Sequence, residues 1–487
     1  MSVRAATLWS MGAQYVVFAV QFAVSVIISR YFLSPAEVGL FSIALSAAMM
    51  VSILQDFGIT RYIAGQPGLD DAQVRTCYSV SLVFALGIGL VILALAWPVS
   101  SFYGDPRLFP VLATVAASYL LAPFGIVPSA LLQREMDFRS LFLVNVGAVI
   151  AWAAVALGCA AGGWSAMSLA WAVVAQQGAR ALLGLWRSGQ RPRLPLRFGG
   201  AGPIMRFGGG TSLLYASGSI GTRSPELILG RLLSFEAVGL FGRATGLAGQ
   251  LRTLVAGAAG GVFYPAFARL RDSGADLSGP YLRVVSGLTA TVWPAMAFLA
   301  AASLPLVLML FGPAWEGVAP LLVWIALSEM IFVGLPLTME LPILLGRMRT
   351  LLALNLMDTA ASIVMLVLGA SYGLEWAAAS RIAYGALWFA IYARLLHGLA
   401  GFRWRSMLAV YVQSAAVSFA TVVPLLLVYR HLAEPAAIGF TTLAAAAAAG
   451  SLCWLACLFL VRHPARHEVI GFAETAWNLR PRPARSA

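Results

Sequence analysis

The stretch RYFLSPAEVGLF, from Arg30 to Phe41, returns two hundred residues later as RLLSFEAVGLF, from Arg231 to Phe241. The letters VGLF stand at 38–41 and again at 238–241, so the two copies are in register. Four matching letters between apolar stretches are weak evidence by themselves. Other blocks of the chain must repeat with them before a duplication can be inferred.

Two other blocks do repeat, in the same order and at nearly the same spacing. The pairs are Pro110-Val111-Leu112 with Pro320-Leu321-Leu322, and Leu131-Leu132-Gln133-Arg134 with Leu344-Leu345-Gly346-Arg347. The sequence therefore predicts two copies of one structural unit. The doubled phrase itself is interpreted as a short turn between two helices, because Ser34-Pro35 and Ser234-Phe235 interrupt the apolar runs.

The composition is that of a membrane protein. Apolar residues make up 60% of the chain and charged residues only 10%, whereas soluble domains carry about 25% charged residues. Apolar runs of about twenty residues recur along the whole chain, and each is long enough to cross a hydrocarbon core as a helix. We predict fourteen spans, near 11–32, 38–60, 76–98, 108–131, 140–161, 164–186, 207–229, 238–265, 283–311, 317–340, 351–372, 374–396, 407–429 and 437–461.

The repeated blocks divide these spans into two sets of six. An even number of helices returns the chain to the same side of the membrane, so the copies are parallel, and transporters of this kind bind substrate between such repeats. The expected fold is an all-α polytopic membrane protein. Its expected parts are an N-terminal lobe (1–200), a C-terminal lobe (201–400), two additional helices (401–461) and a basic cytoplasmic tail (462–487).

Arginine predicts the orientation, since all 32 basic residues are arginines. With a cytoplasmic N-terminus, 23 of them fall on the cytoplasmic side, four on the opposite side and five within spans. Both termini are therefore expected in the cytoplasm. We interpret the net charge of +13 mainly as the result of arginines in cytoplasmic loops, which also attract anionic membrane lipids. Nucleic acid is not an expected partner, because the arginines are scattered over short loops.

Several phrases in this order resemble the polysaccharide-transporter branch of the multidrug/oligosaccharidyl-lipid/polysaccharide flippase superfamily, the Wzx-like lipopolysaccharide and exopolysaccharide exporters. The phrases are Ser34 to Phe41, Asp56 to Ile59, Leu132 to Arg139, Phe263 to Leu270 and Phe311 to Trp315. The resemblance implies a bacterial inner-membrane flippase that moves a polyprenyl-pyrophosphate-linked oligosaccharide outward by alternating access. It implies no enzymatic activity and no cofactor, and it places a polysaccharide polymerase and a chain-length regulator among the expected partners.

A carrier of such a lipid must hold a diphosphate and sugars inside the bilayer. Charged and polar groups within spans are costly and usually mark function, and the planar guanidinium donates two parallel hydrogen bonds to phosphate. Arg252, which lies deeper in its span than Arg243, is the leading candidate for the diphosphate. The predicted substrate-binding residues are Arg252, Arg223, Arg243, Arg180, Gln14, Gln21, Arg30 and Ser219.

Two of these assignments keep an alternative. Arg223 and Glu226 are three residues apart on one helix and either neutralise each other or serve a ligand. Gln14 and Gln21 share a helix face and either bind sugar hydroxyls or join helix to helix.

If a proton or sodium gradient drives export, an acid within a span must bind the ion. We predict Glu226 and Asp358 for this role, with Glu329 and Glu340 as the other candidate acids; Asp358 could instead pair with Arg381. No metal site is expected. His463, His467 and Glu468 have a spacing compatible with one, but we interpret the arginine-rich tail as an ordinary surface helix.

Other functions remain as alternatives. A drug or cation exporter of the same superfamily would favour carboxylates in its cavity, and the spans here hold several arginines. A membrane-embedded polysaccharide polymerase or glycosyltransferase would need a large loop with catalytic acids, and the longest loop, about 186–206, has none. ATP hydrolysis of the P-loop type is excluded by the absence of lysine.

Overall fold

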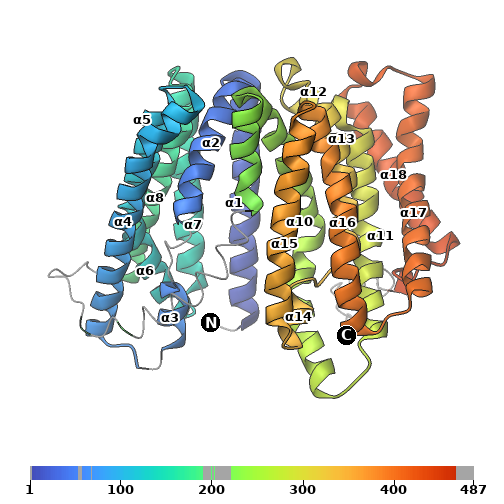
Figure 1. The fold of residues 1–487 in the computed structure, drawn as a ribbon, viewed down its shortest axis with the longest axis horizontal. Helices are drawn as coiled ribbons and strands as arrows, with labels where there is room; N and C mark the ends of the chain where they lie inside the picture. Colours follow the sequence, from blue (N-terminus) through green and yellow to red (C-terminus); the bar gives the residue numbers. More distant parts are fainter. Residues whose placement is uncertain are drawn as a thin grey trace, which may run out of the picture. The chain divides into compact units, whose positions relative to one another are not determined.

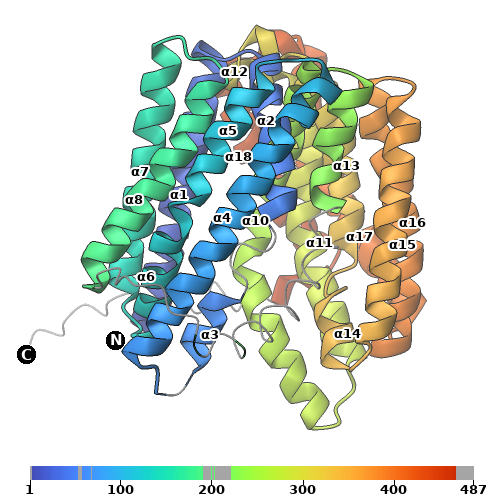
Figure 2. The same ribbon diagram turned by 60° about the vertical axis from the view of Figure 1, so that its left-hand side comes forward.

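The computed structural model describes residues 3–52, 58–66, 68–189, 199, 202 and 221–467. Within these ranges the chain is built of helices and turns and contains no strand, so the all-α prediction is confirmed. The helices form two compact units, Met1–Gly242 (unit 1) and Arg243–Ala487 (unit 2). In each unit the long helices run side by side (Figures 1 and 2).

Unit 1 contains eight helices in its described part before residue 189, followed by a helix described at 221–232. They are α1 (Val3–Tyr31), α2 (Pro35–Val51), α3 (Ile59–Gly65), α4 (Asp71–Tyr103), α5 (Leu108–Tyr119), α6 (Ala122–Arg134), α7 (Phe138–Ala161) and α8 (Met167–Ser188). The long helix α10 (Phe235–Asp272) begins in unit 1 and ends in unit 2.

Unit 2 continues from α10 to the end of the described chain. Its elements are α11 (Ser278–Ala301), α12 (Ser303–Leu310), η2 (Pro313–Trp315), α13 (Val318–Gly334), α14 (Glu340–Leu344), α15 (Met348–Ala370), α16 (Leu374–Ala400), α17 (Trp404–His431), η3 (Pro435–Ala437) and α18 (Phe440–Leu460). The last two long helices, α17 and α18, pack on each other, and both pack on α11.

The same packing scheme recurs in the two units. In unit 1, α4 packs on α5, α5 packs on α8, and α7 packs on α8. In unit 2, α11 packs on α13, α13 packs on α16, and α15 packs on α16. The recurrence follows the order of the repeated sequence blocks, as expected when each copy buries the same apolar faces.

Within the described ranges, nine helical segments are long and apolar enough to cross a membrane. The prediction of fourteen spans is therefore not confirmed in its number. α2 and α13 are apolar but have only 17 residues each, and part of the predicted span 207–229 lies outside the described residues. α8 and α10 are not among the nine either, and both carry arginines within their length.

Three predicted spans are interrupted in the structure. The span 38–60 is divided between α2 and α3, and Gly58 precedes α3 with a φ of 69° that favours glycine. The span 108–131 is divided between α5 and α6, and Pro123 stands in the first turn of α6. The span 283–311 is divided at Ala302, between α11 and α12. Proline lacks the N–H that a continuing helix needs, so it is placed where a new helix begins.

The doubled phrase starts two helices, as the interpretation of a turn requires. Ser34 caps α2 through a capping box: its backbone N–H donates to Glu37 Oε2 at 2.8 Å, and its hydroxyl accepts from the Glu37 N–H at 3.4 Å. Ser234 caps α10 in the same position, since its hydroxyl accepts from the Ala237 N–H at 3.0 Å. A serine cap satisfies backbone donors that the first turn leaves unpaired.

The glycines of the two VGLF motifs bring the first turns of α2 and α10 into contact. A Cβ added to Gly39 would lie 1.7 Å from the carbonyl oxygen of Phe235, and a Cβ added to Gly239 would lie 1.9 Å from that of Pro35. Because Pro35 and Phe235 are equivalent positions of the repeat, the contact is reciprocal. The phrase therefore specifies a close helix crossing in addition to two helix starts, and only glycine fits at its centre.

The segment that follows α18 is anchored by a buried histidine. The side chain of His463 is fully buried, so the prediction of a surface helix is wrong for this residue. The Ala465 N–H donates to Nδ1 at 3.2 Å, which leaves Nε2–H to donate to the Ser414 hydroxyl at 3.0 Å. Ser414 in turn contacts the Thr289 hydroxyl at 2.8 Å. This chain joins residues after α18 to α17 and α11. The tail beyond residue 467 lies outside the described residues.

Candidate functional site

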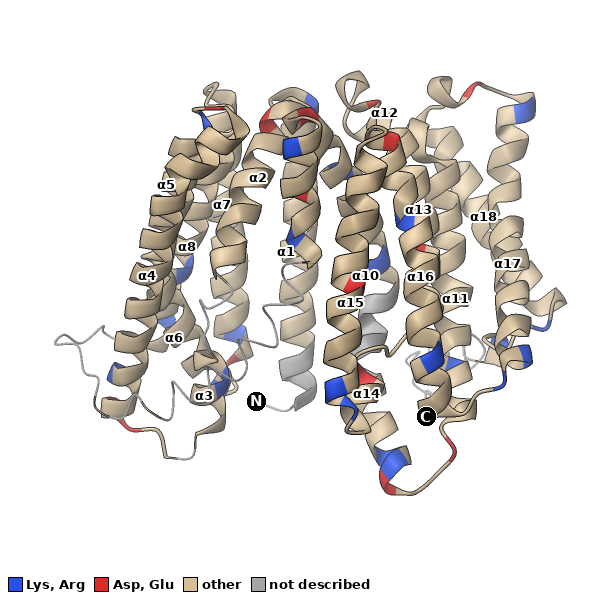
Figure 3. Cartoon of the chain, viewed as in Figure 1, with Lys and Arg blue, Asp and Glu red and all other residues tan. Residues whose placement is uncertain are grey.

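Charged residues gather near the helix ends in each unit, and a smaller number lie along the helices (Figure 3). Three places in the described chain could hold a ligand: a polar cavity in unit 1, an arginine cluster in unit 2 and an apolar cavity in unit 2. Each is built by a different set of helices. Each also offers a different chemistry to a ligand.

The polar cavity of unit 1 has a volume of about 520 Å³ and lies among α1, α6, α7 and α8. It brings together Gln14, Gln21 and Arg180, three of the predicted substrate-binding residues. Three further amides line it: Gln176, on the same helix as Arg180, and also Gln133 at the end of α6 and Asn145 in α7. The sequence showed no periodic polar pattern at Gln133 or Asn145, because each is a single amide in or next to an apolar helix.

Arg180 reaches this cavity because α6 makes room for its side chain. A Cβ added to Gly125 would lie 3.0 Å from Arg180 Cγ and 3.3 Å from Cδ, so the aliphatic part of the arginine occupies the space that the glycine leaves. Arg180 Nε is buried, and among the described residues it has no hydrogen-bond partner. A buried donor without a partner raises the free energy of the folded protein. A ligand that accepts a hydrogen bond from Nε would remove this cost.

In unit 2, Glu329 of α13 bridges two arginines. Its Oε2 accepts from Arg252 Nη1 of α10 at 2.9 Å, and its Oε1 accepts from Arg381 Nη2 of α16 at 3.1 Å. The Glu329 side chain is 9% exposed, whereas that of Arg252 is 46% exposed. We call these three residues the arginine cluster. With two positive charges and one negative charge, these three residues carry a net charge of +1.

Two neighbours fix Arg381 in this cluster. Its Nε donates to the Ser328 hydroxyl at 3.2 Å, and its guanidinium lies 5.6 Å from the centre of the Phe332 ring. The suggested pair between Arg381 and Asp358 is not formed. α16 packs on both α13 and α15. Arg381 forms its ion pair with Glu329 of α13 and not with Asp358 of α15.

The two predicted ion-coupling acids are partly without partners. Asp358 Oδ1 and Glu226 Oε2 are buried and have no hydrogen-bond partner among the described residues. A buried carboxylate oxygen without a partner is unfavourable unless the group binds a proton or a cation. Arg223 lies on the same helix as Glu226, at 221–232, and no ion pair joins the two in the described part of the chain.

The remaining predicted residues are dispersed. Arg243 stacks on two aromatic rings, with its guanidinium 5.7 Å from the ring centre of Phe311 and 5.3 Å from that of Trp315. Both rings belong to the FGPAW phrase quoted for the family resemblance, so that phrase holds an arginine. Arg30 lies in the last turn of α1, 5.9 Å from the ring centre of Tyr31. Ser219 lies outside the described residues.

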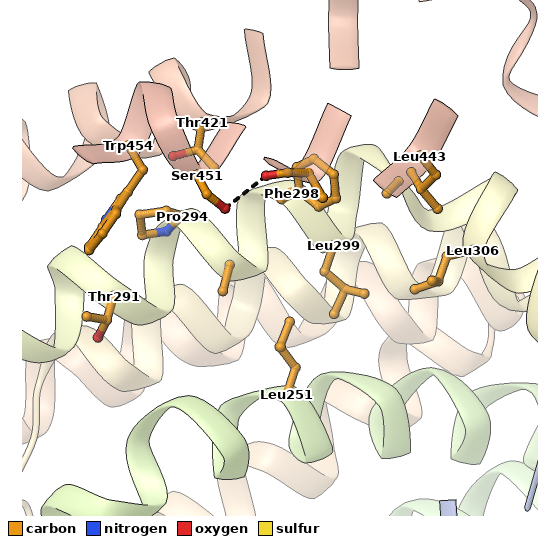
Figure 4. A pocket seen from close by; sticks show the side chains of 13 residues that line it. Leu251, Thr291, Pro294, Phe298, Leu299, Leu306, Thr421, Leu443, Ser451 and Trp454 are labelled. Atoms are coloured by element: carbon orange, nitrogen blue, oxygen red, sulfur yellow. Dashed lines mark hydrogen bonds between the residues drawn. The ribbon is translucent and has the colours of Figure 1, made fainter. Parts of the chain in front are cut away.

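The apolar cavity of unit 2 has a volume of about 500 Å³ (Figure 4). Its lining comes from α10, α11, α12, α17 and α18 and includes Leu251 and Trp454. Three hydroxyls also line it, those of Thr291, Thr421 and Ser451, but each donates to the carbonyl four residues earlier on its own helix at 2.8 or 2.9 Å. The cavity therefore offers a ligand mainly hydrocarbon surface, and the sequence did not predict it.

Comparison with known proteins identifies the family. Residues 27–320, more than half of the chain, match the family described as polysaccharide biosynthesis protein. The chain therefore belongs to this family. It is 24% identical over 336 residues to lipopolysaccharide biosynthesis protein WzxC of Escherichia coli (strain K12), covering 66% of either chain. It is 26% identical over 330 residues to succinoglycan biosynthesis transport protein ExoT of Rhizobium meliloti (strain 1021), covering 66% of this chain and 65% of that one.

The matched part spans about two thirds of the length of these relatives. Two solved structures share the fold. The lipid II flippase MurJ in an inward closed conformation matches with a TM-score of 0.70 at 12% identity, over 94% of this chain and 99% of that one. An inward-facing multidrug resistance MATE family transporter matches with a TM-score of 0.57 at 15% identity, over 78% and 95%. The predicted resemblance to the flippase superfamily is confirmed.

Proposed function

We propose that this member of the polysaccharide biosynthesis protein family translocates a polyprenyl-diphosphate-linked oligosaccharide across the bacterial cytoplasmic membrane by alternating access. The chain is a multi-pass membrane protein. We place both termini in the cytoplasm, on the arginine distribution. The proposed role is transport without catalysis, beside a polysaccharide polymerase and a chain-length regulator as partners. The names of WzxC and ExoT support a polysaccharide cargo.

The arginine cluster is the observation that carries this proposal. A positive charge within membrane-spanning helices is costly and is kept where an anion must be held. Arg252 is the more exposed member, so its guanidinium is available to a ligand while Glu329 holds it in place. A diphosphate suits such a site, because phosphate oxygens accept the forked hydrogen bonds of arginine.

The apolar cavity supplies what the rest of the substrate needs. A prenyl chain is a hydrocarbon, and burying it is favourable by about 0.8 kcal/mol for each CH₂. The hydroxyls of this cavity are already satisfied within their own helices, so a hydrocarbon can fill it without leaving them unpaired. Arginine cluster and apolar cavity both lie in unit 2, and α10 contributes Arg252 to the first and Leu251 to the second.

Export of drugs or other cations is the second candidate, since the MATE fold is shared. The net positive charge of the arginine cluster opposes it, because a cation would be repelled there. Glu226 and Asp358 are the groups that would favour it, and we assign them instead to binding of the driving ion. Each has one buried carboxylate oxygen without a partner among the described residues, which supports that assignment.

The test is reconstitution in liposomes with a fluorescent prenyl-diphosphate glycan, measuring the fraction that becomes accessible from the far leaflet. Arg252→Ala should reduce the initial rate at least about tenfold, the value of one charge-assisted hydrogen bond to the ligand. Arg107→Gln is the matched control, because this exposed arginine pairs only locally, with Asp105 at 2.7 Å. Uptake of a cationic dye without glycolipid movement would overturn the proposal in favour of cation export.

A further inference from the structure

The polar cavity of unit 1 has the side-chain composition of a saccharide site. Five amides line it, contributed by four helices: Gln14, Gln21, Gln133, Asn145 and Gln176. A carboxamide offers both donors and acceptors, and a sugar hydroxyl is also both donor and acceptor. Amides that converge from several directions can therefore pair with the hydroxyls around a sugar ring, whereas a seam between two helices needs only one or two of them.

Aromatic rings provide the apolar part of this lining. Phe18, Phe138 and Phe142 all line the cavity. The ring of Phe142 is held edge-on by Trp9 at 5.1 Å between centroids, and that of Phe18 stacks on Phe22 at 6.3 Å. Binding cavities typically combine such apolar walls with a few placed polar groups, and the C–H faces of a sugar ring match the aromatic rings.

Arg180 gives the cavity its charge. None of the described residues that line it is acidic, and within the described chain Arg180 has no ion pair. Its Nε is a buried donor that has no partner among the described residues, and the absence of a side chain at Gly125 leaves room for its aliphatic chain. The cavity therefore offers a positive charge to an anionic group and amides to the hydroxyls beside it. Its volume of about 520 Å³ is large enough for a single sugar residue.

We propose that the polar cavity of unit 1 binds a sugar residue carrying a carboxylate, with Arg180 as the partner of the carboxylate and the amides as partners of the hydroxyls. This inference deepens the proposed function and rests on it, since the sugar would belong to the translocated glycan. It assigns selection of the glycan to unit 1 and the diphosphate to the arginine cluster of unit 2.

The experiment is saturation-transfer difference NMR on the full chain in nanodiscs, with methyl glucuronide, methyl glucoside and inorganic phosphate as probes. The expected result is saturation of the glucuronide, with affinity about tenfold above that for the glucoside. Arg180→Gln should abolish this preference and Arg180→Lys should restore part of it. Arg187→Gln is the matched control on α8: its guanidinium stacks on Trp186, 4.8 Å from the ring centre, and it should leave the preference unchanged.

Two results would overturn the inference. One is equal affinity for glucuronide and glucoside in the unaltered protein. The other is a displacement of glucuronide by phosphate alone at similar affinity, which would show a general anion site. Failure here is separable from failure of the proposed function, because the liposome assay with a neutral glycan does not depend on Arg180. Flipping without glucuronide preference refutes only the sugar site, and glucuronide binding without any flipping refutes only the transport function.

Discussion

Replacing Gly39 by alanine should separate α2 from α10 at the crossing of the duplicated phrase. The added Cβ would lie 1.7 Å from the Phe235 carbonyl oxygen and 2.9 Å from the Gly239 nitrogen. Both are backbone atoms, so they cannot rotate away as a side chain could. The two helices would have to move apart by roughly 1.5 Å before ordinary van der Waals contact returned.

The expected loss of stability follows from two opposing effects. Overpacking against a rigid neighbour costs about 3 kcal/mol, and alanine regains about 1 kcal/mol over glycine through its higher helix propensity. We therefore expect Gly39→Ala to lower the free energy of unfolding by about 2 kcal/mol. Gly239→Ala should cost a similar amount, because its own Cβ would meet the Pro35 carbonyl oxygen at 1.9 Å.

The assay is thermal unfolding in detergent, followed by intrinsic tryptophan fluorescence. Gly87→Ala is the matched control, because this glycine lies within α4 and an added Cβ would meet no atom within 4 Å. The control should raise the midpoint temperature slightly, whereas the crossing variants should lower it. The double variant should cost less than the sum of the single ones, since both open the same contact. The reasoning is refuted if Gly39→Ala is as stable as Gly87→Ala.

Three other perturbations test the rest of the structure. Glu329→Gln should lower the free energy of unfolding by about 2 kcal/mol, which is less than the usual cost of breaking a buried ion pair because Arg252 is half exposed. Adding Arg381→Gln should restore part of that loss in the same unfolding assay. If the two losses simply add, the contact between Glu329 and Arg381 does not stabilise the protein. Gly125→Ala, whose Cβ would lie 3.0 Å from Arg180 Cγ, should slow flipping of a glycolipid that carries a sugar carboxylate several-fold, with little change in stability or in flipping of a neutral glycolipid. Gly178→Ala, where the nearest atom is 3.7 Å away, should change neither rate. Burial lowers the pKa of His463, so below about pH 6.5 this histidine binds a proton in the unfolded chain but not in the folded one. The midpoint temperature of unfolding should therefore fall as the pH is lowered from 7.5 to 5.5. His463→Gln should make this fall smaller.

The fold class could be predicted because it depends on composition and order. Apolar runs long enough to cross a membrane predict an all-helical membrane protein. The duplicated blocks predict that the same helix packing occurs in both copies. The interruptions were less accessible. Pro123 and Gly58 were visible in the sequence, but membrane helices tolerate both residues within a span. Which of them ends a helix depends on the neighbours that receive the freed backbone groups.

The candidate site was predictable by residue type more than by partnership. Polar residues on the faces of α1 and α8 pointed to Gln14, Gln21 and Arg180, and the structure gathers these around one cavity. Their companion Asn145 is an isolated amide whose neighbours come from other helices, so periodicity along its own helix carried no signal. The ion-pair partner of Arg381 could not be predicted from the sequence either, because it depends on which side of α16 faces α13.

The reciprocal contact at Gly39 and Gly239 also bears on the ancestry of the chain. A contact in which residue i of one copy meets residue j of the other, and j meets i, is the kind that two identical subunits make across a twofold axis. A chain with a single copy of the phrase could build the same crossing by pairing with itself. Gene duplication and fusion would then preserve an existing dimer interface, and each glycine would be inherited with its counterpart already in place.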